Sequence, residues 1–142
     1  MILLDTSGLL SAIDRSQRQH EACAAVVMSA RRPLLLSPFV LAELDYLLAT
    51  TVGASAQNAL LEEVERGAYR LEPFVAADIA AARRVIQRYA DLNVGLADAS
   101  LVVLAKRHRT RDVLTLDERH FRAMRTLDGR RFRLLPADAA SS

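Results

Sequence analysis

Two short apolar runs, neither interrupted by polar residues, limit what this chain can fold into. Residues 2–4 read Ile-Leu-Leu and are followed by Asp5, and residues 34–36 read Leu-Leu-Leu and are followed by Ser37-Pro38. A strand with one face in water alternates apolar and polar side chains, whereas a strand covered on both faces is apolar throughout. The two runs therefore predict buried strands of a parallel sheet that has helices on both faces.

Helical patterns alternate with the predicted strands along the chain. Helices are predicted from near Ser7, over 17–31, from Pro38 to Thr51, over 55–66, 76–89 and 98–109, and through Phe121 and Met124; further strands are predicted at 69–71, 112–116 and 132–135. This alternation is typical of an α/β protein. We expect a single domain over residues 1–142, with a frayed tail from 137 to 142.

The composition fits one ordinary globular domain. Hydrophobic residues make up 51% of the 142 residues and charged residues 25%, which excludes a disordered or collagen-like chain. The single cysteine, Cys23, cannot form an internal disulfide, which favours a reducing cytoplasm. No apolar run approaches the roughly 20 residues that span a bilayer, and the N-terminus lacks the basic segment of a signal peptide. We therefore expect a soluble, cytoplasmic protein without membrane contact.

Basic residues gather towards the C-terminal end of the chain. The net charge is only +2, but 10 of the 19 basic residues lie between Lys106 and Arg133, against four acids. This distribution fits a polyanionic partner and fits solvated helix faces equally well. If the partner is RNA, the candidate contacts are Arg107, Arg109, Arg111, Arg119 and Arg122.

Four acidic residues come from four separate elements. In open parallel sheets, ligands bind at the carboxyl ends of the strands. Asp5 ends the first predicted strand and Asp117 follows the fourth, so both should face the same edge. Asp98 stands near the start of a helix, and Glu43 lies in a strongly apolar helix, where a carboxylate is costly unless exposed, paired or bound to metal.

Each acid also has a purely structural explanation. Asp5 and Asp98 could cap the helices that follow them, Asp117 could begin a turn, and Glu43 could point to solvent. These separate explanations do not account for two apolar strands that deliver acids to one edge of a sheet. If the acids converge, their repulsion would raise some pKa values or require a cation. Oxygen ligands of this kind suit Mg²⁺ or Mn²⁺.

A carboxylate cage of this kind indicates phosphodiester chemistry. One or two divalent ions can activate a water molecule and stabilise the charge that develops on a phosphate. Arginines at the rim would then hold a nucleic acid by its phosphates. The histidines lack the spacing of zinc ligands and are expected at the surface: His20, His108 and His120.

Two other functions stay open. A phosphatase could use Asp5 as a nucleophile, although that chemistry usually has a second acid two residues later, and position 7 is Ser. A receiver-type domain usually has two adjacent acids after its first strand, and Asp5 stands alone. A non-catalytic RNA-binding module could keep the same fold and use its metal for structure.

Four segments of the sequence resemble the PIN-domain ribonucleases, and they occur in the order of that family. They are DTSGLL from Asp5, SPFVLAEL around Glu43, LADAS around Asp98 and LTLDERHF around Asp117. The resemblance covers nearly the whole chain and is strongest to the VapC toxins of bacterial toxin–antitoxin pairs. It implies a three-layer α/β/α sandwich around a central parallel sheet. It also implies an endoribonuclease, dependent on Mg²⁺ or Mn²⁺, that cleaves tRNA or rRNA and so inhibits translation.

The resemblance also implies roles for individual residues. The acidic quartet of the family is matched by Asp5, Glu43, Asp98 and Asp117. Asp5 and Asp98 match the direct metal ligands, and the other two complete the cage, often through water. Ser7 and Thr115 match hydroxyl groups that orient carboxylates or water. Family members commonly form homodimers and are held inactive by a VapB-type antitoxin, which implies the same partners here.

Overall fold

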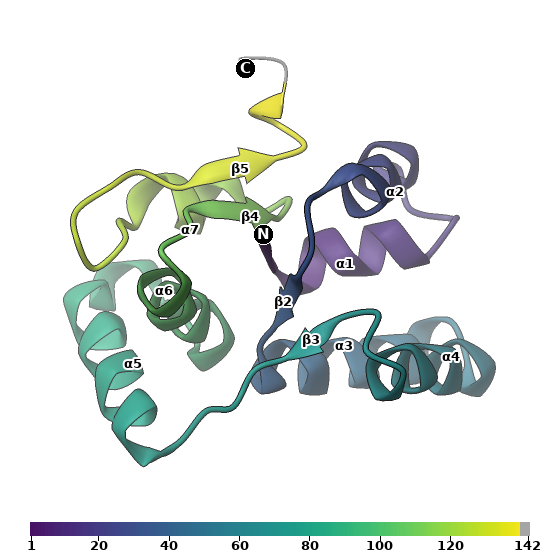
Figure 1. Ribbon diagram of the computed structural model, residues 1–142, viewed down its shortest axis with the longest axis horizontal. Helices are drawn as coiled ribbons and strands as arrows, with labels where there is room; N and C mark the ends of the chain where they lie inside the picture. Colours follow the sequence, from purple (N-terminus) through teal and green to yellow (C-terminus); the bar gives the residue numbers. More distant parts are fainter. Residues whose placement is uncertain (140–142) are drawn as a thin grey trace.

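The computed structural model describes residues 1–139 and contains one parallel sheet (Figure 1). The strands are β1 (Ile2–Leu4), β2 (Leu34–Leu36), β3 (Arg70–Leu71), β4 (Asp112–Leu114) and β5 (Arg133–Leu135). Their order is β3-β2-β1-β4-β5, and every neighbouring pair is parallel. The residues of β1 and β2 are buried throughout, which confirms the prediction drawn from the two apolar runs.

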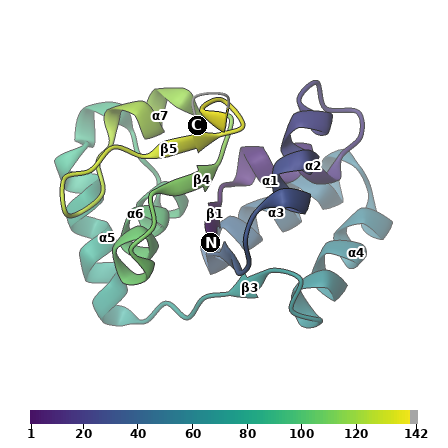
Figure 2. The same cartoon turned by 45° about the horizontal axis from the view of Figure 1, so that its top comes forward.

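Helices cover both faces of this sheet. They are α1 (Thr6–Ile13), α2 (His20–Ser29), α3 (Pro38–Thr51), α4 (Ala54–Glu65), α5 (Ala76–Arg88), the 3₁₀ turn η1 (Ala90–Leu92), α6 (Leu96–His108) and α7 (Glu118–Ala123). Helices α1–α4 lie on one side of the sheet, and α5 and α6 lie on the other (Figures 1 and 2). This arrangement confirms the predicted three-layer α/β/α sandwich.

The direction of winding reverses between β1 and β4. From β1 the chain adds β2 and then β3 on one side, and after β3 it returns through α5 and α6 to place β4 on the other side of β1. In such sheets the connections diverge where the order reverses, and this leaves a crevice outside the carboxyl ends of the two strands. The fold therefore places the residues after β1 and β4 at its natural binding position.

Most element boundaries agree with the sequence pattern, and the differences have local causes. Helix α3 begins at Pro38, and the Ser37 hydroxyl accepts a hydrogen bond from the Phe39 amide at 3.1 Å. Helix α2 begins at His20 rather than at residue 17, because the Asp14 carboxylate holds the preceding residues in a turn through the Ser16 amide. Strand β4 ends at Leu114, two residues earlier than predicted.

The chain end folds back further than the sequence indicates. The Asp138 carboxylate accepts a hydrogen bond from the Leu134 amide at 2.8 Å and forms an ion pair with Arg122 at 2.7 Å. The expectation of a frayed tail is therefore wrong for residues 137–139, and residues 140–142 lie outside the described part of the chain. Cys23 is fully buried. Within residues 1–139, no helix is long and apolar enough to cross a membrane.

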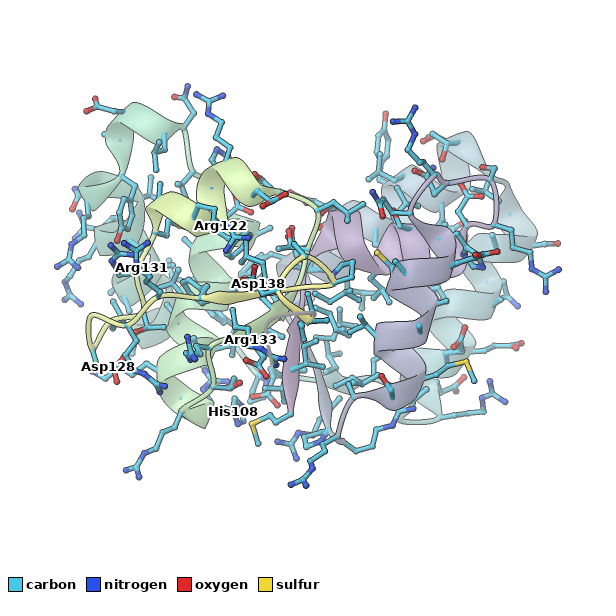
Figure 3. All side chains as sticks on the ribbon, turned by 90° about the horizontal axis from the view of Figure 1, so that it is seen from above. His108, Arg122, Asp128, Arg131, Arg133 and Asp138 are labelled. Atoms are coloured by element: carbon cyan, nitrogen blue, oxygen red, sulfur yellow. The ribbon has the colours of Figure 1, made fainter. Side chains whose placement is uncertain are left out.

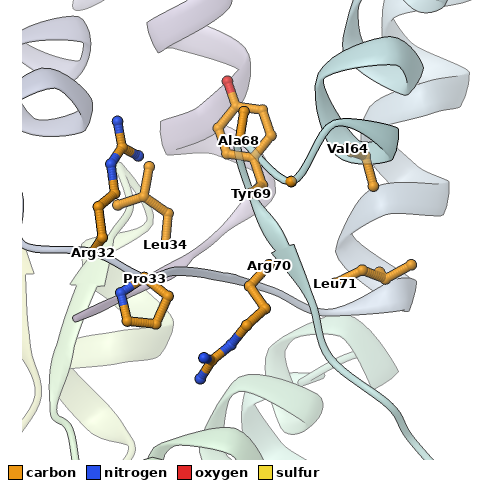
Figure 4. A pocket seen from close by; sticks show the side chains of 9 residues that line it. Arg32, Pro33, Leu34, Val64, Ala68, Tyr69, Arg70 and Leu71 are labelled. Atoms are coloured by element: carbon orange, nitrogen blue, oxygen red, sulfur yellow. The ribbon is translucent and has the colours of Figure 1, made fainter.

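The sheet has one thinly covered edge. Strand β3 is the edge strand, and both of its residues are exposed. A pocket of about 580 Å³ lies between this strand and α4, lined by Arg32, Tyr69 and Leu71 among others (Figure 4). The acids singled out in the sequence do not line this pocket, so it is not where the candidate chemistry lies.

Helix α1 approaches β4 so closely that only glycine fits at one position. A Cβ atom added to Gly8 would lie 2.5 Å from the Leu114 carbonyl oxygen, which is backbone and cannot turn away. This close approach holds the start of α1 against the end of β4. It thereby brings Asp5 and Ser7 next to Thr115.

We expect Gly8→Ala to destabilise the protein by about 1–3 kcal/mol, because α1 must move away from β4 to relieve the overlap. Urea unfolding measures the difference. Gly95→Ala is the matched control, since nothing lies within 4 Å of a Cβ added there. Equal stability of the Gly8 and Gly95 variants would show that the α1–β4 contact adjusts without strain.

Candidate active site

The first acid of the site stands where β1 ends. The Asp5 amide donates a hydrogen bond to the Leu114 carbonyl at 3.0 Å, which fixes this residue beside the end of β4. Its carboxylate accepts hydrogen bonds from the hydroxyls of Thr115 at 2.6 Å and Ser7 at 3.2 Å. Asp5 precedes α1, but its side chain makes no capping hydrogen bond. Helix capping therefore does not explain a carboxylate at this position.

Burial makes the Asp5 carboxylate unusual. Only 4% of the residue is exposed, and no ion pair among residues 1–139 involves it. Burial raises the pKa of Asp5 to about 6, and the charge of Asp98 adds to the rise, although the Thr115 hydrogen bond opposes it. A buried carboxylate without a cation is costly in an ordinary core and is typical of a functional site.

Asp98 and Asp117 converge on a histidine. Asp98 lies in the first turn of α6, and Asp117 precedes α7 and caps it by accepting the His120 amide at 3.0 Å. The Nδ1 atom of His120 lies 3.1 Å from Asp98 Oδ2 and 3.0 Å from Asp117 Oδ2. One ligand atom from each of these three residues lies within 4.8 Å of the other two. The structure thus brings together two of the four predicted acids and adds an imidazole.

The acids repel one another as the sequence predicts. Burial raises the pKa of Asp98, and the Asp117 charge raises it further, although His120 acts in the opposite direction. Asp98 also contributes to the raised pKa of Asp5. Such a set of carboxylates becomes more stable when a cation binds among them.

Glu43 occupies a more exposed position on α3. Its Oε1 atom accepts a hydrogen bond from the Thr6 hydroxyl at 2.8 Å. Thr6 directly follows Asp5, so this hydrogen bond ties Glu43 to the start of α1, where Asp5 lies. Neither Glu43 nor Asp5 belongs to the group formed by Asp98, Asp117 and His120, although the charge of Asp98 acts on Asp5. The exposure of Glu43 removes the desolvation cost that a carboxylate inside an apolar helix would otherwise carry.

The hydroxyl residues connect the two halves of the site. The Ser7 hydroxyl accepts a hydrogen bond from the Leu116 amide at 2.9 Å, and the Thr115 hydroxyl accepts one from the Asp117 amide at 2.9 Å. The same two hydroxyls donate to Asp5. Two hydroxyl groups therefore link the chain after β4, including the Asp117 amide, to the carboxylate of Asp5.

The expectation that the histidines lie at the surface is wrong. The side chain of His120 is 19% exposed, and its Nε2 lies 2.8 Å from the Leu92 carbonyl. His108 pairs with the buried Glu72, and His20 contacts the Ser11 carbonyl at 2.9 Å. One sequence signal could have identified His120: it follows Asp117 by three residues at the start of a helix, where its amide meets the capping carboxylate.

The structure separates the predicted RNA contacts into three groups. Arg122 is held by Glu118 and Asp138. Arg107 is held by Glu72 and Asp78 at the far end of α6 from Asp98, where Arg109 also lies. Arg111 follows in the same segment as Arg109 and donates a hydrogen bond to the Arg131 carbonyl at 3.3 Å. Arg119 is exposed two residues after Asp117, and none of the ion pairs in residues 1–139 involves it.

We expect metal-free Asp5→Asn to be more stable than the natural protein at about pH 7.5. Folding raises the pKa of Asp5 from 3.8 to about 6, so the folded state holds this proton more strongly. The contribution of Asp5 to stability is therefore greatest below about pH 4 and falls as the pH rises through about 6, by up to roughly 3 kcal/mol. Urea unfolding in EDTA at several pH values should show the advantage of the variant disappearing towards pH 4.

Asp14→Asn provides the control for this measurement. Hydrogen bonds from Gln17 and Ser16 lower the pKa of Asp14, so its replacement should not stabilise the protein at neutral pH. A destabilised Asp5→Asn variant at pH 7.5 would mean that folding favours the ionised form of Asp5.

Known proteins share both this sequence and this fold. The PIN domain model matches residues 2–127. Ribonuclease VapC26 of Mycobacterium tuberculosis (strain H37Rv) is 46% identical over 135 residues, which cover 95% of this chain and 100% of the relative. The structure of VapC20 from M. tuberculosis, described as a sarcin–ricin loop cleaving toxin, has a TM-score of 0.78 at 19% identity and covers 84% of this chain and 92% of its own.

A second solved structure has a similar fold. FitAcB from Neisseria gonorrhoeae has a TM-score of 0.62 at 26% identity, over 94% of this chain and 97% of its own. The sequence match to VapC26 spans almost all of both chains, and the family model includes all four acids. The chain therefore belongs to the PIN-domain family, and within it to the VapC ribonucleases, the toxins of toxin–antitoxin pairs.

Proposed function

We propose that Asp5, Asp98 and Asp117 hold a divalent cation, Mg²⁺ or Mn²⁺, with Glu43 completing the site through water. The observation that carries this proposal is the buried Asp5 carboxylate, which has no cation partner within residues 1–139 and lies at the same sheet edge as two further acids. Nucleases of the PIN family use divalent metal ions, and carboxylate oxygens are the ligands that Mg²⁺ and Mn²⁺ prefer. The ligand chemistry of the site therefore fits the ion.

The residues of this chain prepare the site for phosphodiester hydrolysis. A bound ion would supply an activated water molecule and offset the negative charge of the phosphate. Ser7 and Thr115 fix the orientation of Asp5, so this carboxylate need not reorganise during the reaction. The Leu92 carbonyl holds the His120 ring with its Nδ1 towards Asp98 and Asp117. Arg119 is exposed two residues after Asp117 and can bind a phosphate of the substrate.

The substrate that we propose is a structured RNA, either tRNA or rRNA, cut within an exposed loop. Toxins of this family are ribonucleases, and VapC20, with the same fold, cleaves the sarcin–ricin loop. Unstacked loop bases are the usual targets of sequence-specific RNA recognition. Cutting either RNA would stop translation, and both RNAs lie in the cytoplasm, where we propose that this enzyme acts.

As a VapC-type toxin, the chain has an antitoxin partner. We propose that this partner is of the VapB type, that it binds near the acids, and that the toxin forms a homodimer. Large apolar side chains are exposed on the α1–α4 side of the sheet, including Tyr46 at 67% and Leu61 at 41%. Their exposure supports a protein partner on α3 and α4.

The phosphatase alternative loses support from the geometry around Asp5. The residue at position 7, where a second acid would stand, is a serine that donates to the Asp5 carboxylate. Asp5 itself is 4% exposed and accepts two hydroxyl hydrogen bonds. A carboxylate held in this way suits ligand binding better than nucleophilic attack. The ribonuclease relatives likewise favour catalysis over a non-catalytic RNA-binding role.

We expect Asp98→Asn to reduce RNA cleavage at least about 100-fold, because a neutral amide binds a divalent ion and offsets its charge poorly. Incubation with total tRNA and rRNA, followed by sequencing of the RNA ends, measures both the rate and the site. Asp45→Asn, on α3 and hydrogen-bonded to Gln57, is the matched control and should cleave normally. Full activity of a folded Asp98→Asn protein would contradict the assigned role.

We also expect EDTA to stop cleavage and Mg²⁺ or Mn²⁺ to restore it. The same ions should raise the unfolding temperature of the natural protein, because they bind only the folded site. Asp5→Asn should show a smaller rise. Cleavage that continues unchanged in EDTA would mean that the acids act without a metal.

A further inference from the structure

A basic pocket opens at the end of α6 that is remote from Asp98. Its volume is about 490 Å³, and it is lined by five cations, Lys106, Arg107, Arg109, Arg111 and Arg130, and by one acid, Asp128. The cations come from the end of α6, the segment leading into β4 and the loop between α7 and β5. Figure 3 shows Asp128 and Arg131 on that loop, at the side of the molecule where α6 ends at His108.

The acids near this pocket neutralise only part of its positive charge. Arg107 is neutralised by Glu72 and Asp78. Lys106, Arg109 and Arg130 are exposed, and the ion pairs within the described part of the chain include none of them. The one acid, Asp128, accepts a hydrogen bond from Thr126 at 2.6 Å, which lowers its pKa, and the charges of Arg130 and Lys106 lower it further. One carboxylate cannot neutralise both of these cations, and the Arg111 guanidinium has only the Arg131 carbonyl as a hydrogen-bond partner among residues 1–139, at 3.3 Å. The pocket therefore keeps a positive surplus that attracts anions.

Helix stabilisation explains only part of this cluster. Cations in the last turn interact favourably with the helix dipole, and this accounts for Lys106. The last carbonyls of α6 are already satisfied by backbone, since the Thr110 amide donates to the Ala105 carbonyl at 3.1 Å. The side chains of Arg111 and Arg130 come from outside the helix, so the dipole gives no reason for their convergence.

We propose that this pocket is a second phosphate-binding site for the RNA substrate; the inference rests on the function proposed above for the acids. Arg109 directly follows α6 and stands eleven positions after Asp98, which corresponds to about 16 Å along the helix axis. That distance spans roughly five nucleotides of a stacked strand. A folded RNA can therefore contact both ends of α6, whereas a very short RNA reaches only the acids.

RNA is favoured over an acidic protein segment because the two sites lie at the two ends of one rigid helix. Substrate phosphates recur along the strand, so a folded RNA seated at the acids can place further phosphates at the pocket by passing over the surface beside α6, whose middle is buried. Arginine guanidinium groups bind phosphate through paired hydrogen bonds. The pocket thus gives binding energy to long substrates without contacting the reacting bond.

The test measures RNA binding in EDTA, where we expect no cleavage. A fluorescent hairpin RNA of about 20 base pairs is titrated with protein in EDTA at several salt concentrations. Lys106→Gln/Arg109→Gln/Arg130→Gln should weaken binding and reduce the slope of log Kd against log salt by about 2–3, since each lost phosphate contact contributes about 0.7–0.9. Arg15→Gln/Arg18→Gln/Arg66→Gln is the control of equal charge, with its changes at the end of α4 and in the α1–α2 loop.

Kinetics separate this pocket from the acids. With Mg²⁺ or Mn²⁺, the pocket variant should raise KM for the hairpin several-fold, keep kcat, and leave cleavage of a trinucleotide unchanged. Equal losses of kcat/KM on the hairpin and on the trinucleotide would overturn the proposal. So would a slope of log Kd against log salt equal to that of the control variant. So would a variant that keeps RNA affinity and loses affinity for polyglutamate, since the pocket would then serve an acidic protein.

Two further results keep the test decisive. If the triple variant does not fold, Arg109→Gln alone should reduce the slope by about 1. If the natural protein cleaves no RNA with either metal, the function proposed for the acids fails. The binding slope in EDTA still decides whether the pocket holds phosphates.

Discussion

The candidate active site is built around one carboxylate, that of Asp5, which is buried at the end of β1. Nothing in an ordinary core would favour this placement, because burial opposes the charge and raises the pKa of Asp5 to about 6. The fold supplies two hydroxyl donors instead of a cation, and these come from α1 and from the end of β4. Gly8 permits the contact between these two elements. The negative charge of Asp5, which has no cation partner within residues 1–139, is what supports the proposal of a cation site in this crevice.

The sequence predicted the positions of two of the acids because each position follows from the strand that precedes the acid. Apolar runs without alternation indicate parallel strands, and parallel strands place the residues that follow them at one edge. The pattern of residues alone therefore assigns Asp5 and Asp117 to the same edge. The position of Asp98 depends on how α6 docks against the sheet, which periodicity does not report. Only the resemblance to a known family placed this acid with the others.

Side-chain partners were the part that the sequence could not predict. Arg107 and Arg122 count as free charge in the sequence, yet Arg107 is held by two acids from distant parts of the chain and Arg122 by Asp138 across a turn. His120 shows the reverse case, since it reads as a surface residue and instead lies between two carboxylates. Pairings of this kind arise from tertiary packing, so a count of charges along a chain does not identify a binding surface.

Helix α6 shows how the fold can carry opposite charges without large cost. Its N-terminal end holds Asp98, and its C-terminal end holds Lys106 and Arg107, so each charge lies where the helix dipole favours it. A helix with acids at its N-terminal end and cations at its C-terminal end is therefore stabilised by its dipole at both ends. The length of the helix also fixes the separation between Asp98 and the cations at its other end. If those cations bind phosphate as we propose, that separation makes the length of a bound RNA a physical criterion for recognition.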